Sequence, residues 1–163
     1  MIAIIHGQKP EGNNNGPAGS GANWRELNKI QYDGIGVFLE DDDDGNPTFV
    51  GLMDSGRYHL RAETLSSSEG IHRPAIHILD SEKNPIDILS GFGKPGMGLA
   101  EIDFPINLES SVEGVTPILA AGALLRVESF VSIADAAGNK ALGGAISDGD
   151  VELYTRLVIQ KLS

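Results

Sequence analysis

The strongest constraint on the fold is a two-residue alternation of apolar and polar side chains that recurs in short segments along the chain. In residues 150–162, Leu157 and Ile159 alternate with Arg156 and Gln160. A strand places successive side chains on opposite faces, whereas a helix brings together residues three and four apart. The segment is also rich in β-branched residues. The alternation therefore predicts a half-buried β-strand.

Further segments show the same short, apolar or alternating character and are bounded by Gly, Asp, Asn or Pro. Together with 150–162, the predicted strands are 34–40, 47–52, 57–65, 73–80, 85–90, 99–108, 115–121 and 123–136. The only helical candidate is Asn23–Ile30. Many short strands separated by turn residues are typical of a β-sandwich or barrel.

The first 23 residues differ in composition from the rest of the chain. Residues 7–23 are mostly Gly, Asn, Pro and Ser, and such a segment has almost nothing to bury. We therefore predict an N-terminal arm over 1–23 and one folded domain over 24–163. The apolar residues Ile2, Ile4 and Ile5 precede the polar part of the arm. They either add a strand to a neighbouring molecule's sheet or pack as a strand on their own domain.

Charge and composition exclude several classes of protein. The chain of 163 residues has 23 acidic and 12 basic residues, a net charge of −11, which opposes binding to nucleic acid. It has no Cys, so disulfides and thiolate metal sites are excluded. No apolar run approaches the roughly 20 residues that a membrane-spanning helix needs, and the N-terminus lacks the pattern of a signal peptide. We expect a soluble protein with neither nucleic-acid nor membrane partners.

The most acidic segment is 40–46, with the sequence EDDDDGN. Glu40, Asp42 and Asp44 occupy positions one, three and five of a calcium-binding EF-hand loop. Position twelve is Gly51 instead of the required Glu, and the flanking segments are predicted strands, so an EF-hand is rejected. A solvated hairpin tip is the favoured interpretation, and calcium binding by these three carboxylates is the alternative.

Signatures of catalysis are absent from the sequence. It contains neither a Gly-x-Ser-x-Gly motif nor a phosphate-binding P-loop. Residues 91–98 include the spacing Gly-x-Gly-x-x-Gly, but no helix follows, so the phosphate site of a dinucleotide fold is missing. We predict a non-enzymatic protein without a cofactor. Partner contacts are expected at Trp24, Phe92 and Met97, and His59 and His77 are expected to point outward from strands.

Motifs in residues 30–65 indicate a more specific fold. A Tyr-Asp pair leads through Gly-rich turns to a strand with Phe, and a Gly-x-Tyr-x-Leu strand follows. The residues concerned are Tyr32, Asp33, Phe49, Gly56, Tyr58 and Leu60. They resemble the opening of the tumour-necrosis-factor and complement-type jelly rolls. Residues 119–128 are similar to the family's Leu-x-x-Gly-Asp-x-Leu-x-Leu segment, with Ala123 where Asp is usual.

This resemblance implies an all-β antiparallel sandwich of the jelly-roll type, here with an extended N-terminal arm, assembled as a homotrimer. The same sandwich occurs in bacteriophage head decoration (cement) proteins and in fibres. The expected function is therefore that of a capsid decoration protein, made in the host cytoplasm and located in the virion. Its partner would be the major capsid protein or another virion protein, clamped by the arm. The alternative is a receptor- or carbohydrate-binding tip domain of a fibre or tail protein.

Overall fold

The computed structural model describes residues 1–15, 21–66, 71–95, 108–131, 142 and 150–163. The strands in this part of the chain are β1 (Ile2–Lys9), β2 (Gly21–Trp24), β3 (Lys29–Asp33), β4 (Val37–Asp41), β5 (Pro47–Leu52), β6 (Tyr58–Ser66), β7 (Ile71–Leu79), β8 (Pro85–Ser90), β9 (Lys94–Pro95), β10 (Leu108–Val115), β11 (Leu124–Val131) and β12 (Glu152–Lys161). None of these described residues belongs to a helix that could cross a membrane.

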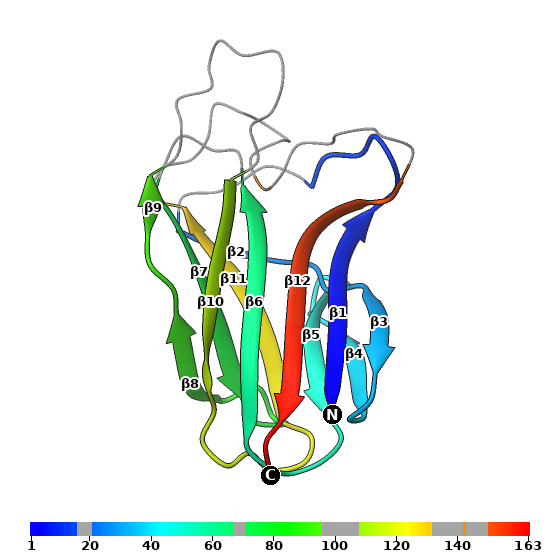
Figure 1. Ribbon diagram of the computed structural model, residues 1–163, viewed down its shortest axis with the longest axis vertical. Coiled ribbons are helices and arrows are strands. Elements are labelled where there is room, and N and C mark those ends of the chain that lie inside the picture. The colour runs from blue at the N-terminus through cyan, green and yellow to red at the C-terminus, as the bar shows by residue number, and fades with distance from the viewer. Residues whose placement is uncertain (16–20, 67–70, 96–107, 132–141, 143–149) are drawn as a thin grey trace.

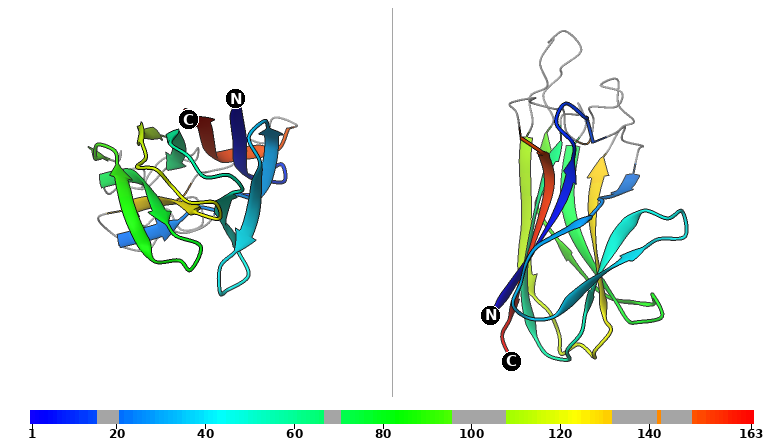
Figure 2. Two further views of the ribbon diagram at one scale, coloured as in Figure 1. Left: turned by 90° about the horizontal axis from the view of Figure 1, so that it is seen from below. Right: turned by 90° about the vertical axis from the view of Figure 1, so that its right-hand side faces the viewer.

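The strands form two sheets that pack face to face (Figures 1 and 2). Sheet A has the order β10-β6-β12-β1-β3. Sheet B has the order β4-β5-β11-β7-β8, with β2 paired to the end of β11 and β9 paired to the start of β7. The pairings between the described strands are antiparallel. This arrangement confirms the predicted all-β antiparallel sandwich.

The interior changes character along the length of the sandwich. At the end where the chain termini lie, apolar side chains such as Leu60, Ile76 and Ile159 are fully buried. Towards the opposite end several inward positions are polar, beside a small apolar cluster of Val131 and Leu142. Thr64 is in register with both Ser110 and Thr155, and all three are buried. Burial of hydroxyl groups contributes little without hydrogen bonds, so the apolar end provides most of the hydrophobic stabilisation.

The N-terminal strand is part of the folded domain. β1 lies inside sheet A, where it pairs with β12 on one side and with β3 on the other. Ala3 and Ile5 are completely buried in the core. Of the two alternatives left open for this segment, the structure shows packing on its own domain. The prediction of a free arm is therefore wrong for residues 2–9. The backbone N–H and C=O groups of this segment pair with two neighbouring strands, and composition gives no information about such pairing.

The remainder of the predicted arm also contacts the domain wherever it is described. The backbone carbonyl of Asn13 accepts a hydrogen bond from the Tyr154 hydroxyl, and the Asn15 side chain donates one to the Leu142 carbonyl. β2 pairs with β11. Residues 16–20 lie outside the described part of the chain.

The predicted helix over Asn23–Ile30 is not formed. Residues 25–28 instead carry the chain from sheet B to sheet A. The backbone N–H of Arg25 donates to the Val127 carbonyl, and that of Leu27 donates to the Pro47 carbonyl. Both side chains are completely buried. Helical propensity is a weak preference, and burial between two sheets overrides it here.

The strand predicted over 115–121 is also wrong, since β10 covers Leu108–Val115 and ends where that strand was expected to begin. After β10, Pro117 cannot donate to a ladder, and only an isolated bridge joins Leu119 to Gly56. Two other predicted strands are described only in part. Residues 99–107 of the strand predicted over 99–108 and residues 132–136 of the strand predicted over 123–136 lie outside the described residues.

A bulge interrupts the alternation in β12. Gly7 of β1 is opposite Thr155 and Gln8 is opposite Leu153, so Tyr154 is the extra residue. An extra residue reverses the faces of all side chains beyond it. Leu153 therefore points outward and is exposed, although the alternation predicts the same face as Leu157.

The turn after β3 depends on the carboxylate of Asp33. It accepts hydrogen bonds from the backbone N–H groups of Ile35, Gly36 and Val37 at 3.1, 2.7 and 3.1 Å. Burial alone would raise the pKa of Asp33, but these three donors outweigh it and hold the pKa below its ordinary value. Gly36 has a φ of 81°, which only Gly adopts without strain.

We expect the fold to lose stability in acid through such turn carboxylates. Hydrogen bonds also lower the pKa values of Asp42 and Asp80, chiefly those donated by the backbone of Asn46 and the side chain of Asn84. Groups with a lowered folded-state pKa stabilise above the unfolded value of about 3.9, and this contribution disappears as the pH falls through the folded values. Urea unfolding should therefore show a falling free energy of unfolding below about pH 4.

The matched variants for this prediction are Asp33→Asn and Asp41→Asn. Asp33→Asn should flatten the acid limb, because an amide does not titrate. Asp41→Asn should leave it unchanged, since Asp41 is exposed and lies outside the turn hydrogen bonds described above. An acid limb of equal slope in Asp33→Asn and the parent would contradict the assignment.

Candidate functional site

The outer surface of sheet B is hollowed between two projecting hairpins. The β4–β5 and β7–β8 hairpins extend from the same side of the sandwich (Figure 2, right). Between them is a cavity of about 410 Å³, called the sheet B hollow below. Its lining residues are Trp24, Asp42, Asp43, Asp44, Phe49, Leu79, Lys83 and Arg126.

Arg126 forms the floor of the sheet B hollow. Its guanidinium carbon lies 4.0 Å from the ring centroid of Trp24 and 4.6 Å from that of Phe49. Its Nη2 donates to Oδ2 of Asp42 at 3.1 Å. Burial lowers the pKa of Arg126, while the Asp42 carboxylate opposes that shift. Two aromatic faces and one carboxylate therefore fix this cation in place.

The three predicted calcium ligands have separate roles. Asp42 accepts hydrogen bonds from the backbone N–H groups of Asp44 and Asn46, as well as from Arg126. Glu40 forms a 3.0 Å ion pair with Lys83. Asp44 is exposed at the hairpin tip. Within the described residues, no three His, Asp or Glu side chains are grouped as metal ligands would be.

Trp24 is the exposed wall of the sheet B hollow. It retains 37% of its surface exposed, and its ring packs edge-on against His77 with the centroids 4.8 Å apart. His77 in turn contacts the carboxylate of Glu128. His59 lies on β6 of sheet A beside Glu113, at 4.0 Å, so the two outward histidines belong to different sheets and do not meet within the chain.

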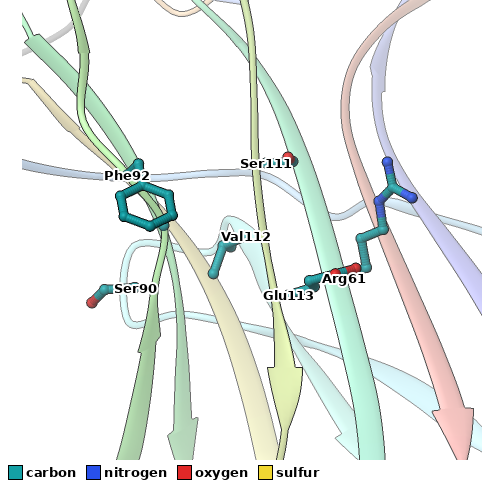
Figure 3. A pocket seen from close by; sticks show the side chains of 7 residues that line it. Arg61, Ser90, Phe92, Ser111, Val112 and Glu113 are labelled. Carbon is teal, nitrogen blue, oxygen red and sulfur yellow. The ribbon is translucent and has the colours of Figure 1, made fainter.

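A second concave surface, the edge groove, lies where β8 of sheet B approaches β10 of sheet A (Figure 3). Its volume is about 360 Å³, and its lining residues are Arg61, Ser90, Gly91, Phe92, Ser111, Val112 and Glu113. The side chain of Phe92 stands out from it with 92% of its surface exposed. A Cβ on Gly91 would lie 2.8 Å from the Ser111 carbonyl oxygen, so this close approach of the two edges requires Gly.

The outer surface of sheet A changes from apolar to charged across its strands. At the β3–β1–β12 side, Tyr32, Ile4 and Val158 are in register. Tyr32 is exposed, and the two aliphatic side chains are half-buried. We call these three residues the sheet A patch. At the β6–β10 side, Arg61 forms a 2.8 Å ion pair with Glu63.

The structure separates the six predicted partner contacts. Ile5 is buried in the core and cannot reach a partner, whereas Ile4 belongs to the sheet A patch and Ile2 is exposed beside it. Trp24 is on sheet B, and Phe92 is beside the edge groove. Met97 lies outside the described residues.

Sequence reasoning missed the residues that complete these surfaces. Arg126, Phe49 and Lys83 reach the sheet B hollow from β11, β5 and the β7–β8 turn. No local pattern in the sequence pointed to Arg126, because its position opposite Phe49 follows only from the pairing of β11 with β5.

Comparison with solved structures identifies the fold. Crystal structures of murine APRIL at pH 5.0 and pH 8.0 each match with a TM-score of 0.51, at 13% and 15% sequence identity. Both matches cover 99% of this chain and 100% of the other chain. No protein-family model and no curated protein sequence matches the chain. At such low identity the similarity concerns the fold alone, which is an antiparallel jelly-roll sandwich.

Proposed function

We propose that the chain is a structural virion protein that assembles as a homotrimer and decorates a bacteriophage head. The observation that carries the assembly is the position of two apolar surfaces at opposite edges of sheet A. The sheet A patch lies on β3, β1 and β12, whereas Phe92 projects beside β10. An almost fully exposed Phe costs solvation free energy unless a partner covers it.

Two different surfaces at opposite edges favour a head-to-tail contact. Phe92 of one copy would pack on the sheet A patch of the next, and the charged β6–β10 region would form the polar border. Head-to-tail contacts close into a ring when the rotation between copies allows it. The family resemblance supports three copies as the number that closes.

Attachment to a capsid is the second part of the proposal. β1 is an inner strand, so residues 1–23 are not a free arm that could clamp a capsid. We instead assign the capsid contacts to the surface of the assembled ring. Three linked copies bind with a higher effective concentration than one, so individually weak contacts suffice. Co-sedimentation with capsid shells from an infected host tests this part, and a chain that stays in the supernatant would contradict it.

The assembly is tested with Phe92→Glu and Tyr32→Glu in native mass spectrometry. Each variant should be monomeric, because each places a charge in one half of every contact. Met53→Glu is the matched control, since Met53 is exposed on the turn after β5 and outside both surfaces. It should remain trimeric.

A mixture of the two variants distinguishes a head-to-tail contact from a symmetric one. Phe92→Glu retains an intact sheet A patch, and Tyr32→Glu retains an intact Phe92. One intact contact can therefore form between them, and the mixture should yield heterodimers without trimers. A monomeric parent chain, or variants that stay trimeric, would overturn the assembly.

A second function, that of a carbohydrate-binding tip domain of a fibre, is favoured by one specific observation. Sugar sites need an exposed aromatic platform, and the only Trp of the chain lines the sheet B hollow. Low aromatic content argues against this function only if the few aromatic residues are scattered. Here Trp24 and Phe49 converge on the same cation.

A further inference from the structure

We propose that the sheet B hollow binds a neutral saccharide, with one sugar ring stacked on Trp24 and its hydroxyl groups hydrogen-bonded to Asp43 and Asp44. This inference rests on the second function above and specifies its ligand and residues. It is independent of the trimer and of the capsid, because the hollow is on sheet B and the proposed contact between copies uses sheet A and the edge groove.

The size and the wall of the hollow suit such a ligand. A volume of about 410 Å³ lies within the range of small-molecule sites, roughly 300–1,000 Å³. Trp24 is held by Arg126, which lies over a face of its ring, and by the edge contact with His77. A ring that is fixed before binding loses little conformational freedom when a ligand stacks on it. The C–H face of a sugar ring provides the apolar surface that such stacking requires.

The polar groups around the hollow are divided into engaged and available ones. The two cations are already paired, Arg126 with Asp42 and Lys83 with Glu40. Asp43 and Asp44 are exposed at the tip, and within the described residues no hydrogen bond or ion pair to either carboxylate is formed. The Asp43 charge acts on Arg126 from a distance, but neither carboxylate accepts a hydrogen bond within the described residues, so both can accept from sugar hydroxyls in the hollow that they line.

The same charges exclude other ligand classes. An anion would meet two free carboxylates while the nearby cations are neutralised. A metal ion needs several grouped oxygen ligands, and Asp42 is committed to its turn and to Arg126. An organic cation on Trp24 would be repelled by the positive charge of Arg126, whose guanidinium carbon lies 4.0 Å from the centroid of that ring. A neutral ligand with many hydroxyl groups avoids all three conflicts.

The only Trp of the chain provides a direct reporter of binding. We expect Trp fluorescence of the full chain to change saturably on titration with one or more of maltotriose, cellotriose, chitotriose and galactobiose. Calorimetry of the responding sugar gives the affinity. Asp43→Ala combined with Asp44→Ala should weaken binding at least tenfold, because both charge-assisted hydrogen bonds are lost.

Asp41→Ala is the matched control, since it removes the same charge from the same hairpin at a residue that does not line the hollow. It should change the affinity less than twofold. Trp24→Ala should abolish binding in calorimetry. If that variant fails to fold, the combined Asp43→Ala and Asp44→Ala variant still tests the site. Absence of a fluorescence change and of heat with all four sugars at millimolar concentration would overturn the proposal. So would equal affinity in the doubly substituted variant, or a response only to a polylysine peptide or to heparin.

The monomeric variant Phe92→Glu is the experiment that tests the saccharide site separately from the trimer assembly. It should bind the responding sugar with the parent's affinity per site, although it no longer forms trimers. Loss of sugar binding in that monomer would show that the site requires a second copy and would overturn the site as proposed. If the parent chain proves to be monomeric and still binds the sugar, the assembly is overturned and the saccharide site is supported.

Discussion

Removal of residues 1–9 is expected to prevent folding of the chain, not to release a folded domain without an arm. β1 is an inner strand of sheet A, so its loss removes both of its ladders, to β12 and to β3. It also removes Ala3 and Ile5 from the core, where both are completely buried. A native domain is stable by only about 5–15 kcal/mol, and losing a central strand exceeds that margin. Circular dichroism and a thermal melt of the truncated chain test the expectation.

Point substitutions in β1 provide the graded form of the same test. Ile5→Ala should lower the free energy of unfolding by about 2–5 kcal/mol, because it opens a cavity in the core. Ile4→Ala is the matched control, with a half-buried side chain on the outward face. In a monomeric background it should cost about 1 kcal/mol or less. A cooperative melt of the truncated chain at the parent's temperature would show that β1 is dispensable.

Replacement of Arg25 by Ala is expected to cost about 2–4 kcal/mol of folding free energy. Arg25 is completely buried where the chain crosses between the sheets. It donates to Thr155 Oγ1 at 3.0 Å and to the carbonyl oxygens of Leu65 and Tyr154 at 2.8 and 2.9 Å. Burial lowers its pKa to about 9, so the guanidinium remains charged at neutral pH. Alanine would deprive two buried acceptors and one part-buried acceptor of the guanidinium donor and would leave a cavity beside them.

The cost of burying the charge works in the opposite direction. Among the residues that the structure describes, the buried Nη1 of Arg25 has no hydrogen-bond partner, so this part of the guanidinium is desolvated without compensation there. Arg25→Met fills the volume and avoids that cost, and it should therefore be more stable than Arg25→Ala. Glu26→Ala is the control in the same segment. It removes the part-exposed ion pair with Lys9 and a nearby charge that favours the protonated form of Arg25, but none of the Arg25 hydrogen bonds, and should cost about 1 kcal/mol or less.

Urea unfolding of the four proteins at neutral pH measures these differences. The expected order of stability is Glu26→Ala nearest the parent, then Arg25→Met, then Arg25→Ala. An Arg25→Ala variant within about 0.5 kcal/mol of the parent would show that the buried guanidinium is not needed to join the sheets. That outcome would transfer the stabilising role in the crossing to Leu27, the other completely buried residue there.

Local patterns in the sequence determined the secondary structure of most strands and the fold class. The alternation of Leu157 and Ile159 with Arg156 and Gln160 predicts β12, and the observed burial follows it in that half of the strand. The hairpin tip at 40–46 was predicted from its Asp and Gly residues and is found between β4 and β5. These features are local, because side-chain period and turn chemistry act over only a few residues.

Tertiary structure alone decided the path of residues 1–15 and 21–30 and the composition of the candidate sites. Because a polar segment follows β1, the sequence suggested an arm instead of an inner strand. The place of β1 in sheet A depends on a partner more than 140 residues away, as the pairing of Ile4 with Val158 shows. The bulge at Tyr154 reversed a face that the period had predicted. Trp24, Asp42 and Arg126 meet only because β2 and β5 both pair with β11. Such contacts depend on non-local pairing and burial, which no short-range pattern encodes.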